Sequence, residues 1–230
     1  MNFICKVYNH IVWRYNNFIN KIKIKRMHFG YFGEKVMFAF PSVISNPKQV
    51  FLHDYCRLQQ RHIIYNYTGK FIMKEYSGAS IDLLVITGNH TPTVGIPQYS
   101  LAISHINDNE KDVIVEEDVW IGARVTLLSG AHIGRGAVVG ANSLINKEIP
   151  PYAIVVGSPA KIIAAKFTIE QILEHEKLLY PQERRFSREY LEALFESHYK
   201  GLRTIGVTSD LEEIGFNQFM KKNKLEYIKK

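Results

Sequence analysis

The most regular stretch of the chain runs from Val115 to Pro150, where aliphatic residues recur at every sixth position. Divided into units of six, the stretch reads VEEDVW, IGARVT, LLSGAH, IGRGAV, VGANSL and INKEIP. The first position of each unit is Val, Ile or Leu, and the fifth is small or aliphatic throughout. Glycine takes the second position in three of the six units.

This spacing matches neither a helix nor a simple strand, whose apolar faces repeat about every 3.6 and every 2 residues. A period of six is typical of the hexapeptide β-helix. Each unit is then a short strand and a turn, and three units close one triangular coil. First-position side chains fill the prism, and the fifth position lies near a corner where the walls converge. We expect the glycines to serve the turns, because glycine reaches backbone angles that cost other residues free energy.

The period is weaker before this stretch. In residues 28–86 only isolated pairs of first-position and fifth-position residues fit the six-residue frame. These pairs are Leu52 with Cys56, Leu58 with His62 and Ile64 with Thr68. Ile72 with Tyr76, and then Leu84, resume the frame two residues out of register. Terminal repeats of a solenoid are commonly irregular, so these residues predict early coils that begin at a cap. From Thr87 to Lys111 the pattern is lost, and residues 88–97 are turn-forming throughout. We expect a loop here, and loops on rigid scaffolds often carry function.

Both ends of the chain predict helices. Apolar residues recur at helical spacing in residues 1–24, as Ile4, Val7, Tyr8, Ile11, Val12, Tyr15, Phe18 and Ile19. This amphipathic helix would pack on the coils or on a neighbouring subunit, with a membrane surface as the alternative. Ile169–Leu179 and Ser187–Tyr199 also read as helices. The predicted organisation is a helix over 1–27, a β-helix over 28–163 with the loop 87–111 inserted, and a helical extension over 164–230.

Charge and cysteine content narrow the setting of this 230-residue chain. The net charge is +7, and much of the excess lies near the ends, at Lys21, Lys23, Lys25, Arg26, Lys221, Lys222, Lys224, Lys229 and Lys230. A nucleic-acid surface would interleave such charge with aromatic residues, so no nucleic-acid partner is predicted. The excess also favours anionic ligands. The two cysteines, Cys5 and Cys56, are far apart in the sequence, which predicts reduced thiols and therefore a cytoplasmic protein. The sequence contains no apolar run of signal-peptide or membrane-spanning length, so we expect no membrane association.

Three segments resemble a known family: WIGA at 120–123, IGRGAVVGANS at 133–143 and KEIPPYAIVVGSPAK at 147–161. They look like the hexapeptide-repeat acyltransferases, closest to the branch of maltose, galactoside and streptogramin O-acetyltransferases and capsule-biosynthesis relatives. The resemblance is dense from about Thr87 to Ile163. It implies a left-handed parallel β-helix, a homotrimer with sites between subunits, and acetyl-CoA as acyl donor.

The resemblance implies that His90, at the mouth of the loop, is the general base. An alcohol is a poor nucleophile until a base takes its proton, and histidine titrates near neutrality. The thioester of acetyl-CoA is already activated, so no covalent enzyme intermediate is needed. The group that orients His90 stays open among the nearby carboxylates, which are Asp108, Asp112, Glu116 and Glu117.

The same resemblance implies cofactor-binding positions. Trp120 would lie beside the thioester or acceptor pocket, although packing between coils explains it equally well. Ala123 and Ala141 match small positions that contact the pantetheine arm. Lys147 and Lys161 match cations that meet the coenzyme A phosphates, and lysine suits a phosphate as a point charge.

A metal-dependent alternative rests on His105 and His132, since hexapeptide-repeat carbonic anhydrases bind zinc through three histidines. Zinc needs several imidazoles converging at about 2.0–2.1 Å, and the closely paired histidines of those relatives are missing from the sequence. We therefore expect no metal. The predicted function is acetyl transfer from acetyl-CoA to a hydroxyl, on a sugar of a surface polysaccharide precursor. The alternatives are N-acetylation of a xenobiotic or amino sugar, and a catalytically silent β-helix that serves in binding or assembly.

Overall fold

The computed structural model describes residues 18–208 and Gln218. Its main body consists of three sheets whose neighbouring strands are parallel, apart from one antiparallel pair at the end. The first sheet contains β1 (Tyr31–Phe32), β4 (Val50–Leu52), β7 (Phe71–Met73), β10 (Val113–Val115), β13 (His132–Ile133) and β16 (Glu148–Ile149). The second contains β2 (Met37–Phe38), β5 (Arg57–Leu58), β8 (Gly78–Ala79), β11 (Trp120–Ile121), β14 (Val138–Val139), β17 (Ala153–Val156) and β18 (Lys161–Ala165). The third contains β3 (Ser42–Ile44), β6 (His62–Tyr65), β9 (Leu84–Ile86), β12 (Thr126–Leu127) and β15 (Leu144–Ile145).

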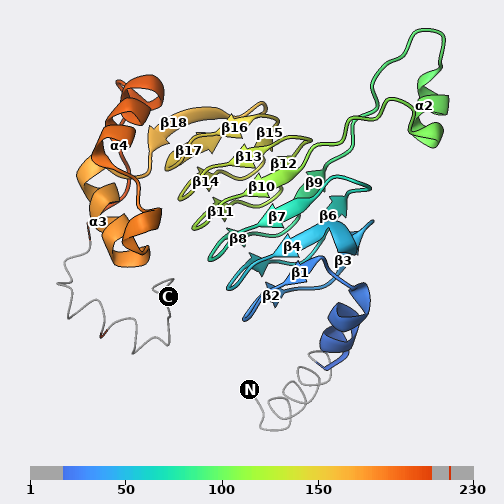
Figure 1. Cartoon of the computed structure of the whole chain (residues 1–230), viewed down its shortest axis with the longest axis horizontal. Helices are drawn as coiled ribbons and strands as arrows, with labels where there is room; N and C mark the ends of the chain where they lie inside the picture. Colours follow the sequence, from blue (N-terminus) through green and yellow to red (C-terminus); the bar gives the residue numbers. More distant parts are fainter. Residues whose placement is uncertain (1–17, 209–217, 219–230) are drawn as a thin grey trace, which may run out of the picture.

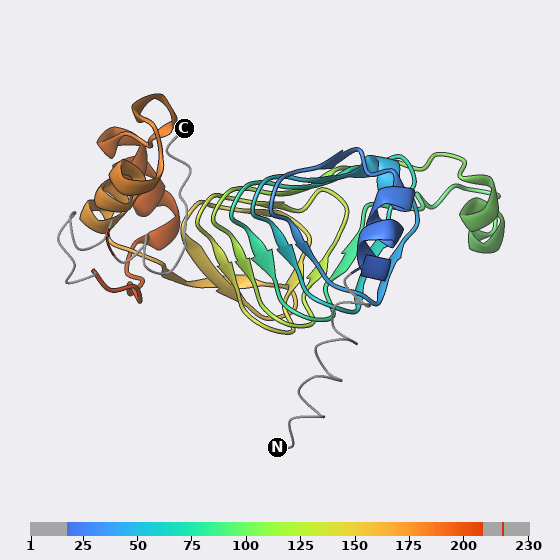
Figure 2. The ribbon, with the colours of Figure 1, turned by 90° about the horizontal axis from the view of Figure 1, so that it is seen from below.

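Successive strands of the chain visit the three sheets in turn, so each set of three strands forms one coil of a left-handed β-helix (Figures 1 and 2). The predicted fold class is confirmed. Val115 pairs with Ile133 and Ile121 with Val139, so partners lie three six-residue units apart. The first-position side chains are fully buried from Val115 to Ile145, and the fifth-position side chains from Val119 to Ser143 are buried as well. These two rows form the core of the prism.

Two parts of the predicted frame are wrong. Ile149 is not a fifth-position residue, because it pairs with Ile133 and therefore begins the next coil two residues early. Ile72, Tyr76 and Leu84 are not interior positions either. The residue that follows each of them, Met73, Ser77 and Val85, is buried instead, as are Phe71, Ala79 and Leu83 in the same coil.

The error at Ile72, Tyr76 and Leu84 arises in the turn after β6. Thr68 is exposed, whereas the polar side chain of Asn66 is buried. Asn66 accepts a hydrogen bond from the Asn46 amide at 3.1 Å and donates one to the Asn46 carbonyl at 2.9 Å. A buried amide that is satisfied in this way is stable at a corner. The turn is consequently longer than in a regular unit, and the frame shifts by three residues.

The glycines at the second position do not supply the left-handed turns. Positive φ falls instead on the fourth position, at Asp118, Arg124, Gly130, Gly136 and Asn142. Gly122 is needed for close packing, since an added Cβ would lie 2.6 Å from the amide nitrogen of Ala141 in the next coil. Small residues at this position therefore let adjacent coils stack.

The last coil is closed by the antiparallel pairing of β17 and β18, after which the chain forms helices. These are α3 (Ile169–Leu179), α4 (Arg188–Leu194) and a π-helical turn η3 (Phe195–Tyr199), with short 3-10 turns η1 (Pro47–Gln49) and η2 (Gln182–Arg184) elsewhere. Ser187 caps α4 by accepting a hydrogen bond from the Tyr190 amide, which confirms it as a helix start. Residues 18–27 are helical. The rest of the predicted N-terminal helix lies outside the described residues.

Charged side chains join α3 to the coils. Arg135 donates to Glu176 at 3.0 Å and to Glu117 at 3.3 Å, and the Tyr152 hydroxyl donates to Glu176 at 2.7 Å. Both carboxylates are almost fully buried. Removing one partner of such a network leaves an uncompensated buried charge, so it fixes α3 on the end of the prism. No helix in the described part of the chain is long and apolar enough to cross a membrane.

Candidate functional site

The predicted loop leaves the wall after β9 and returns at β10, and it projects from the prism on the side away from α3 and α4 (Figure 1). It is not wholly irregular, because α2 (Gln98–Ser104) forms within it. Glu110 fastens its base by accepting hydrogen bonds from Thr68 N at 2.8 Å, Gly69 N at 2.6 Å and Thr87 Oγ1 at 3.0 Å. Partial burial opposes ionisation of Glu110, but these bonds hold its pKa below the ordinary value.

His90, His105 and Asp108 come together at the mouth of this loop. The Asp108 carboxylate contacts both rings, with Oδ1 3.1 Å from His90 Nδ1 and Oδ2 2.7 Å from His105 Nδ1. Only 11% of the Asp108 side chain is exposed, against 42% for His90 and 44% for His105. The hydrogen bond to His105, followed by the one to His90, holds the pKa of Asp108 below its usual range, so the carboxylate is ionised.

Of the four carboxylates that could orient His90, the structure brings Asp108 to it. The other three contact different groups. Asp112 accepts from Lys70 N, Glu116 contacts Lys74 and His132, and Glu117 contacts Arg135 and Arg184. Sequence reasoning could not separate them, because the choice depends on the path of α2 and the turn after it.

His90 and His105 are not paired in the sequence, but the fold brings their ring centroids to 5.9 Å from one another. Within the part of the chain that the structure describes, they form with Asp108 a group that could hold a metal ion, with ligand atoms within 4.8 Å of one another. His132 is not part of it, because its Nε2 lies 2.9 Å from Glu116. The Asp108 oxygens lie 3.1 Å and 2.7 Å from the two ring nitrogens, which are the lengths of hydrogen bonds.

Trp120 points outward from β11, as the repeat frame predicts, and is 45% exposed. Its strand neighbours are Gly78 in the coil before and Val138 in the coil after. A Cβ on Gly78 would lie 3.0 Å from the Trp120 ring, so the indole packs closely over Gly78. The ring therefore packs between coils and still offers an exposed face.

The predicted cofactor positions after Trp120 lie on adjacent turns of the prism. Asn142 N donates to Ala123 O at 2.9 Å, which places Ala123 and Ala141 on successive coils. Lys161 pairs with Val156 in the β17–β18 hairpin, and the residue before it, Ala160, donates its amide to Leu144 O. Ala141, Lys147 and Lys161 are exposed. Among the described residues, no hydrogen bond, ion pair or ring contact links His90 to these residues within one chain.

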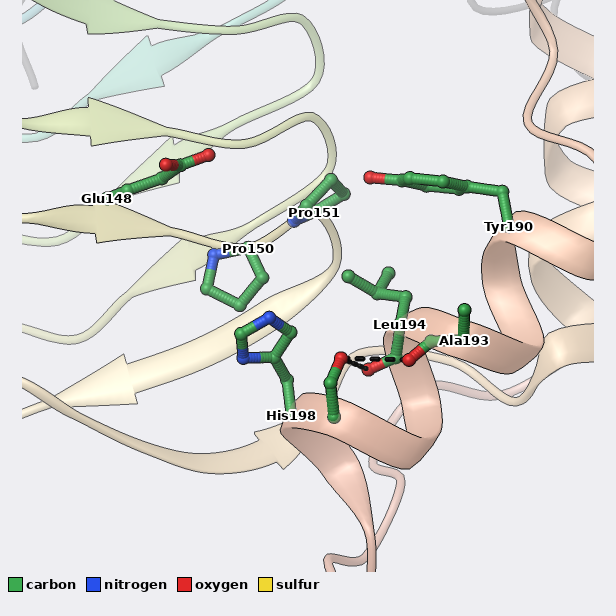
Figure 3. Close-up of a pocket in the computed structure, with 8 residues that line it drawn as sticks. Glu148, Pro150, Pro151, Tyr190, Ala193, Leu194 and His198 are labelled. Carbon is green, nitrogen blue, oxygen red and sulfur yellow. Dashed lines mark hydrogen bonds between the residues drawn. The ribbon is translucent and has the colours of Figure 1, made fainter.

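Sequence reasoning missed a cavity of about 390 Å³ at the opposite end of the molecule (Figure 3). It lies between the coil corner at Pro150 and Pro151 and the face of α4 and η3 that is turned toward this corner. Its remaining lining residues are Glu148, Tyr190, Ala193, Leu194, Ser197 and His198. The only feature of the sequence near this cavity that stands out is the pair Pro150 and Pro151, which predicts a turn and not a cavity.

Comparisons with known proteins support the repeat assignment. The family described as bacterial transferase hexapeptide (six repeats) matches residues 112–147. A chloramphenicol acetyltransferase of Klebsiella aerogenes is 48% identical over 61 residues, which are 26% of this chain and 29% of that protein. The chain thus spans less than a third of the length of that curated relative.

Two solved structures share the fold. A hexapeptide-repeat acetyltransferase of Vibrio cholerae in complex with acetyl-coenzyme A matches with a TM-score of 0.57 and 22% identity, over 65% of this chain and 78% of that one. A maltose O-acetyltransferase of Clostridium difficile matches with a TM-score of 0.55 and 21% identity, over 62% and 73%. The hexapeptide family therefore matches the repeat segment of the chain, and the two solved structures show that the whole prism shares the left-handed β-helix fold. The relatives named here are acetyltransferases.

Proposed function

We propose that the protein is an acetyl-CoA-dependent O-acetyltransferase with His90 as general base. The observation that supports this most directly is the pairing of His90 with an ionised, largely shielded Asp108 at the mouth of the loop. A carboxylate at Nδ1 favours the tautomer with its proton on Nδ1 and leaves Nε2 to accept a proton. No hydrogen bond to Nε2 of His90 is formed by the described residues.

The chemistry follows from that arrangement. Nε2 of His90 takes the proton of the acceptor hydroxyl while the hydroxyl oxygen attacks the thioester carbonyl carbon. The carbon–sulfur bond then breaks, and the coenzyme A thiolate receives the proton from the imidazolium. Asp108 stabilises the transient imidazolium, as a carboxylate does in hydrolytic triads. The metal-binding alternative would occupy the same imidazoles and remove the base.

The proposed donor site follows the outer wall of the prism. Trp120 would contact the thioester end, Ala123 and Ala141 would let the pantetheine arm lie close to the wall, and Lys147 and Lys161 would meet the phosphates. Their exposure and their positions on successive coils support this path. We further propose a homotrimer in the cytoplasm, and a sugar hydroxyl of a surface polysaccharide precursor as acceptor.

A xenobiotic acceptor is the second candidate, favoured by the similarity of one segment to chloramphenicol acetyltransferase. Release of free thiol from acetyl-CoA, measured against a panel of sugars, sugar nucleotides and antibiotics, decides between the two acceptors. A protein that releases no thiol with any of them would be a silent binding or assembly module.

The base assignment is tested by His90→Ala. General-base catalysis is worth about 10²–10⁴-fold, so kcat should fall by that order while KM for acetyl-CoA stays near the wild-type value. His132→Ala is the matched control, because His132 lies on the coil wall bound to Glu116. If a chelator stops the wild-type enzyme, the general-base assignment of His90 is wrong and the metal-dependent alternative holds.

A further inference from the structure

We propose that His105 is a positioning residue, which acts on the reaction by holding Asp108 in place against His90. This inference rests on the proposed function, because it assigns His105 a role only through His90. It differs from the metal-dependent alternative, which was the only role that the sequence suggested for His105.

The first argument is the way the Asp108 carboxylate is held. Its two oxygens are divided between the two rings, and the contact with His105 at 2.7 Å is shorter than the one with His90 at 3.1 Å. In the described part of the chain, no other hydrogen bond reaches this carboxylate. A carboxylate with one partner can rotate about its χ angles, whereas a second partner on the other oxygen fixes its plane.

The second argument is that His105 is itself fixed. It ends α2 in a left-handed conformation, with φ of 54°, and its amide donates to Leu101 O at 3.0 Å. Its ring is stacked on Tyr67, with centroids 5.1 Å apart and planes 6° apart. Tyr67 lies in the turn that Glu110 holds through three consecutive amides, those of Tyr67, Thr68 and Gly69.

The contacts therefore run without a gap from the rigid coils to the base, through Tyr67, His105 and Asp108 to His90. Without these contacts, Asp108 would move with the exposed turn of the long loop in which it lies. Small displacements of a catalytic group cost rate even when the group itself is retained. His105 thus restricts the motion of Asp108, and the stacking on Tyr67 restricts the motion of His105.

Three substitutions separate hydrogen bonding from bulk. His105→Asn keeps a donor on the atom bonded to Cγ, where Nδ1 is, and asparagine tolerates the left-handed conformation. His105→Gln moves the donor one bond outward, and His105→Ala removes it. We expect kcat to fall about 10- to 100-fold in the Ala and Gln variants, the size of one lost hydrogen bond to a charged group. The Asn variant should retain most of the wild-type kcat, and KM for acetyl-CoA should not change in any of them.

A double-mutant cycle tests whether His105 acts through Asp108. In an Asp108→Asn background, the further change His105→Ala should lower kcat little, because its target is already gone. An equal loss in both backgrounds would overturn the inference. It would also be overturned if His105→Asn were as damaging as His105→Ala, since the donor would then be irrelevant.

A readout without catalysis keeps this test separate from the proposed function. Nitrogen-15 NMR of the ligand-free protein at a pH where His90 is neutral reports which ring nitrogen carries the proton. We expect His90 to be protonated on Nδ1 in the wild type and in His105→Asn. In His105→Ala we expect a mixture of His90 tautomers, with the proton on Nδ1 or on Nε2. If no acceptor is acetylated but this pattern holds, the proposed function fails and the positioning role stands. An unchanged tautomer in His105→Ala removes the positioning role.

Discussion

His62 occupies the fifth position of a repeat and shows what a polar residue costs inside the prism. Its side chain is fully buried, with Nδ1 2.8 Å from Gln59 O and the ring 4.6 Å from that of Phe38. Nε2 has no hydrogen-bond partner among the described residues. Burial lowers the pKa of His62, only partly offset by the Gln59 carbonyl, so the folded protein holds it neutral.

This burial makes folding stability depend on pH. Between the lowered folded pKa and the unfolded value of about 6.5, the unfolded chain binds more protons, so the free energy of unfolding falls as the pH falls. The loss approaches about 1.4 kcal/mol per pH unit for this one group. Urea unfolding at pH 7.5 and pH 5.5 should show this slope in the wild type and a smaller one in His62→Leu. Equal slopes would mean that protonated His62 is accommodated in the fold.

The proposed phosphate contacts give a second prediction for single side chains. Lys147→Glu combined with Lys161→Glu should raise KM for acetyl-CoA without changing the melting temperature, because both side chains are exposed. The difference from wild type should shrink in high salt, where exposed charges are screened. The control is Lys177→Glu, on α3 away from the coil wall. An unchanged KM in the double variant would place the phosphates elsewhere.

His90 could be proposed from the sequence because a histidine in this setting matches the motif of a known family. Asp108 could not be chosen among four carboxylates, and His105 was considered only as a ligand of the metal-dependent alternative. Their convergence depends on a helix of seven residues inside the loop and on a left-handed turn at its end. Neither leaves a period in the sequence, and the stacking on Tyr67 joins residues far apart in the chain. The elevated pKa of the buried Cys56 thiol, about 12, likewise follows from packing, although the sequence did predict a reduced cysteine.

At the scale of the element, the repeat frame was predictable wherever the unit length stayed at six. Aliphatic side chains at the first position have only the interior of the prism in which to be buried. Prediction failed where a turn gained or lost residues, after Ile64 and after Ile145, because the polar groups that stabilise such turns lie in other coils. The role of the glycines was misread for the same reason, since it depends on the neighbouring coil.

The repeat frame predicts a sharp contrast between two positions of the same coil, one interior and one at a turn. Ile133→Asp places a charge on a fully buried side chain, where burial without a partner costs several kcal/mol. We expect loss of soluble, folded protein. Ala141→Asp introduces the same charge at an exposed turn and should leave the melting curve within a few degrees of wild type. Circular dichroism melts of the two purified variants are the measurement, and a normal melt for Ile133→Asp would contradict the frame.

At the scale of the whole molecule, the loop 87–111 exposes apolar side chains that a lone chain leaves in water. Val94 is fully exposed, Tyr99 is 79% exposed and Ile103 is 63% exposed. Tyr99 and Ile103 belong to α2, which projects from the prism (Figure 2) on the same loop as His90. Contiguous exposed apolar surface commonly marks a site of protein contact. The separation of His90 from the proposed coenzyme A positions within one chain fits a site shared between neighbouring subunits.

We therefore expect a homotrimer, in which the loop of one chain lies against the wall of the next. Three chains of 26.6 kDa give a mass of about 80 kDa, which light scattering coupled to gel filtration measures directly. Tyr99→Lys together with Ile103→Lys should shift the protein towards the monomer, because each charge would have to be desolvated in the contact. Activity should fall in parallel, since the site would lose its second subunit. Tyr31→Lys is the control, as Tyr31 is exposed on the first coil, outside the loop. A wild-type mass of one chain at micromolar concentration would contradict the shared site, and His90 would then have to meet its donor within a single subunit.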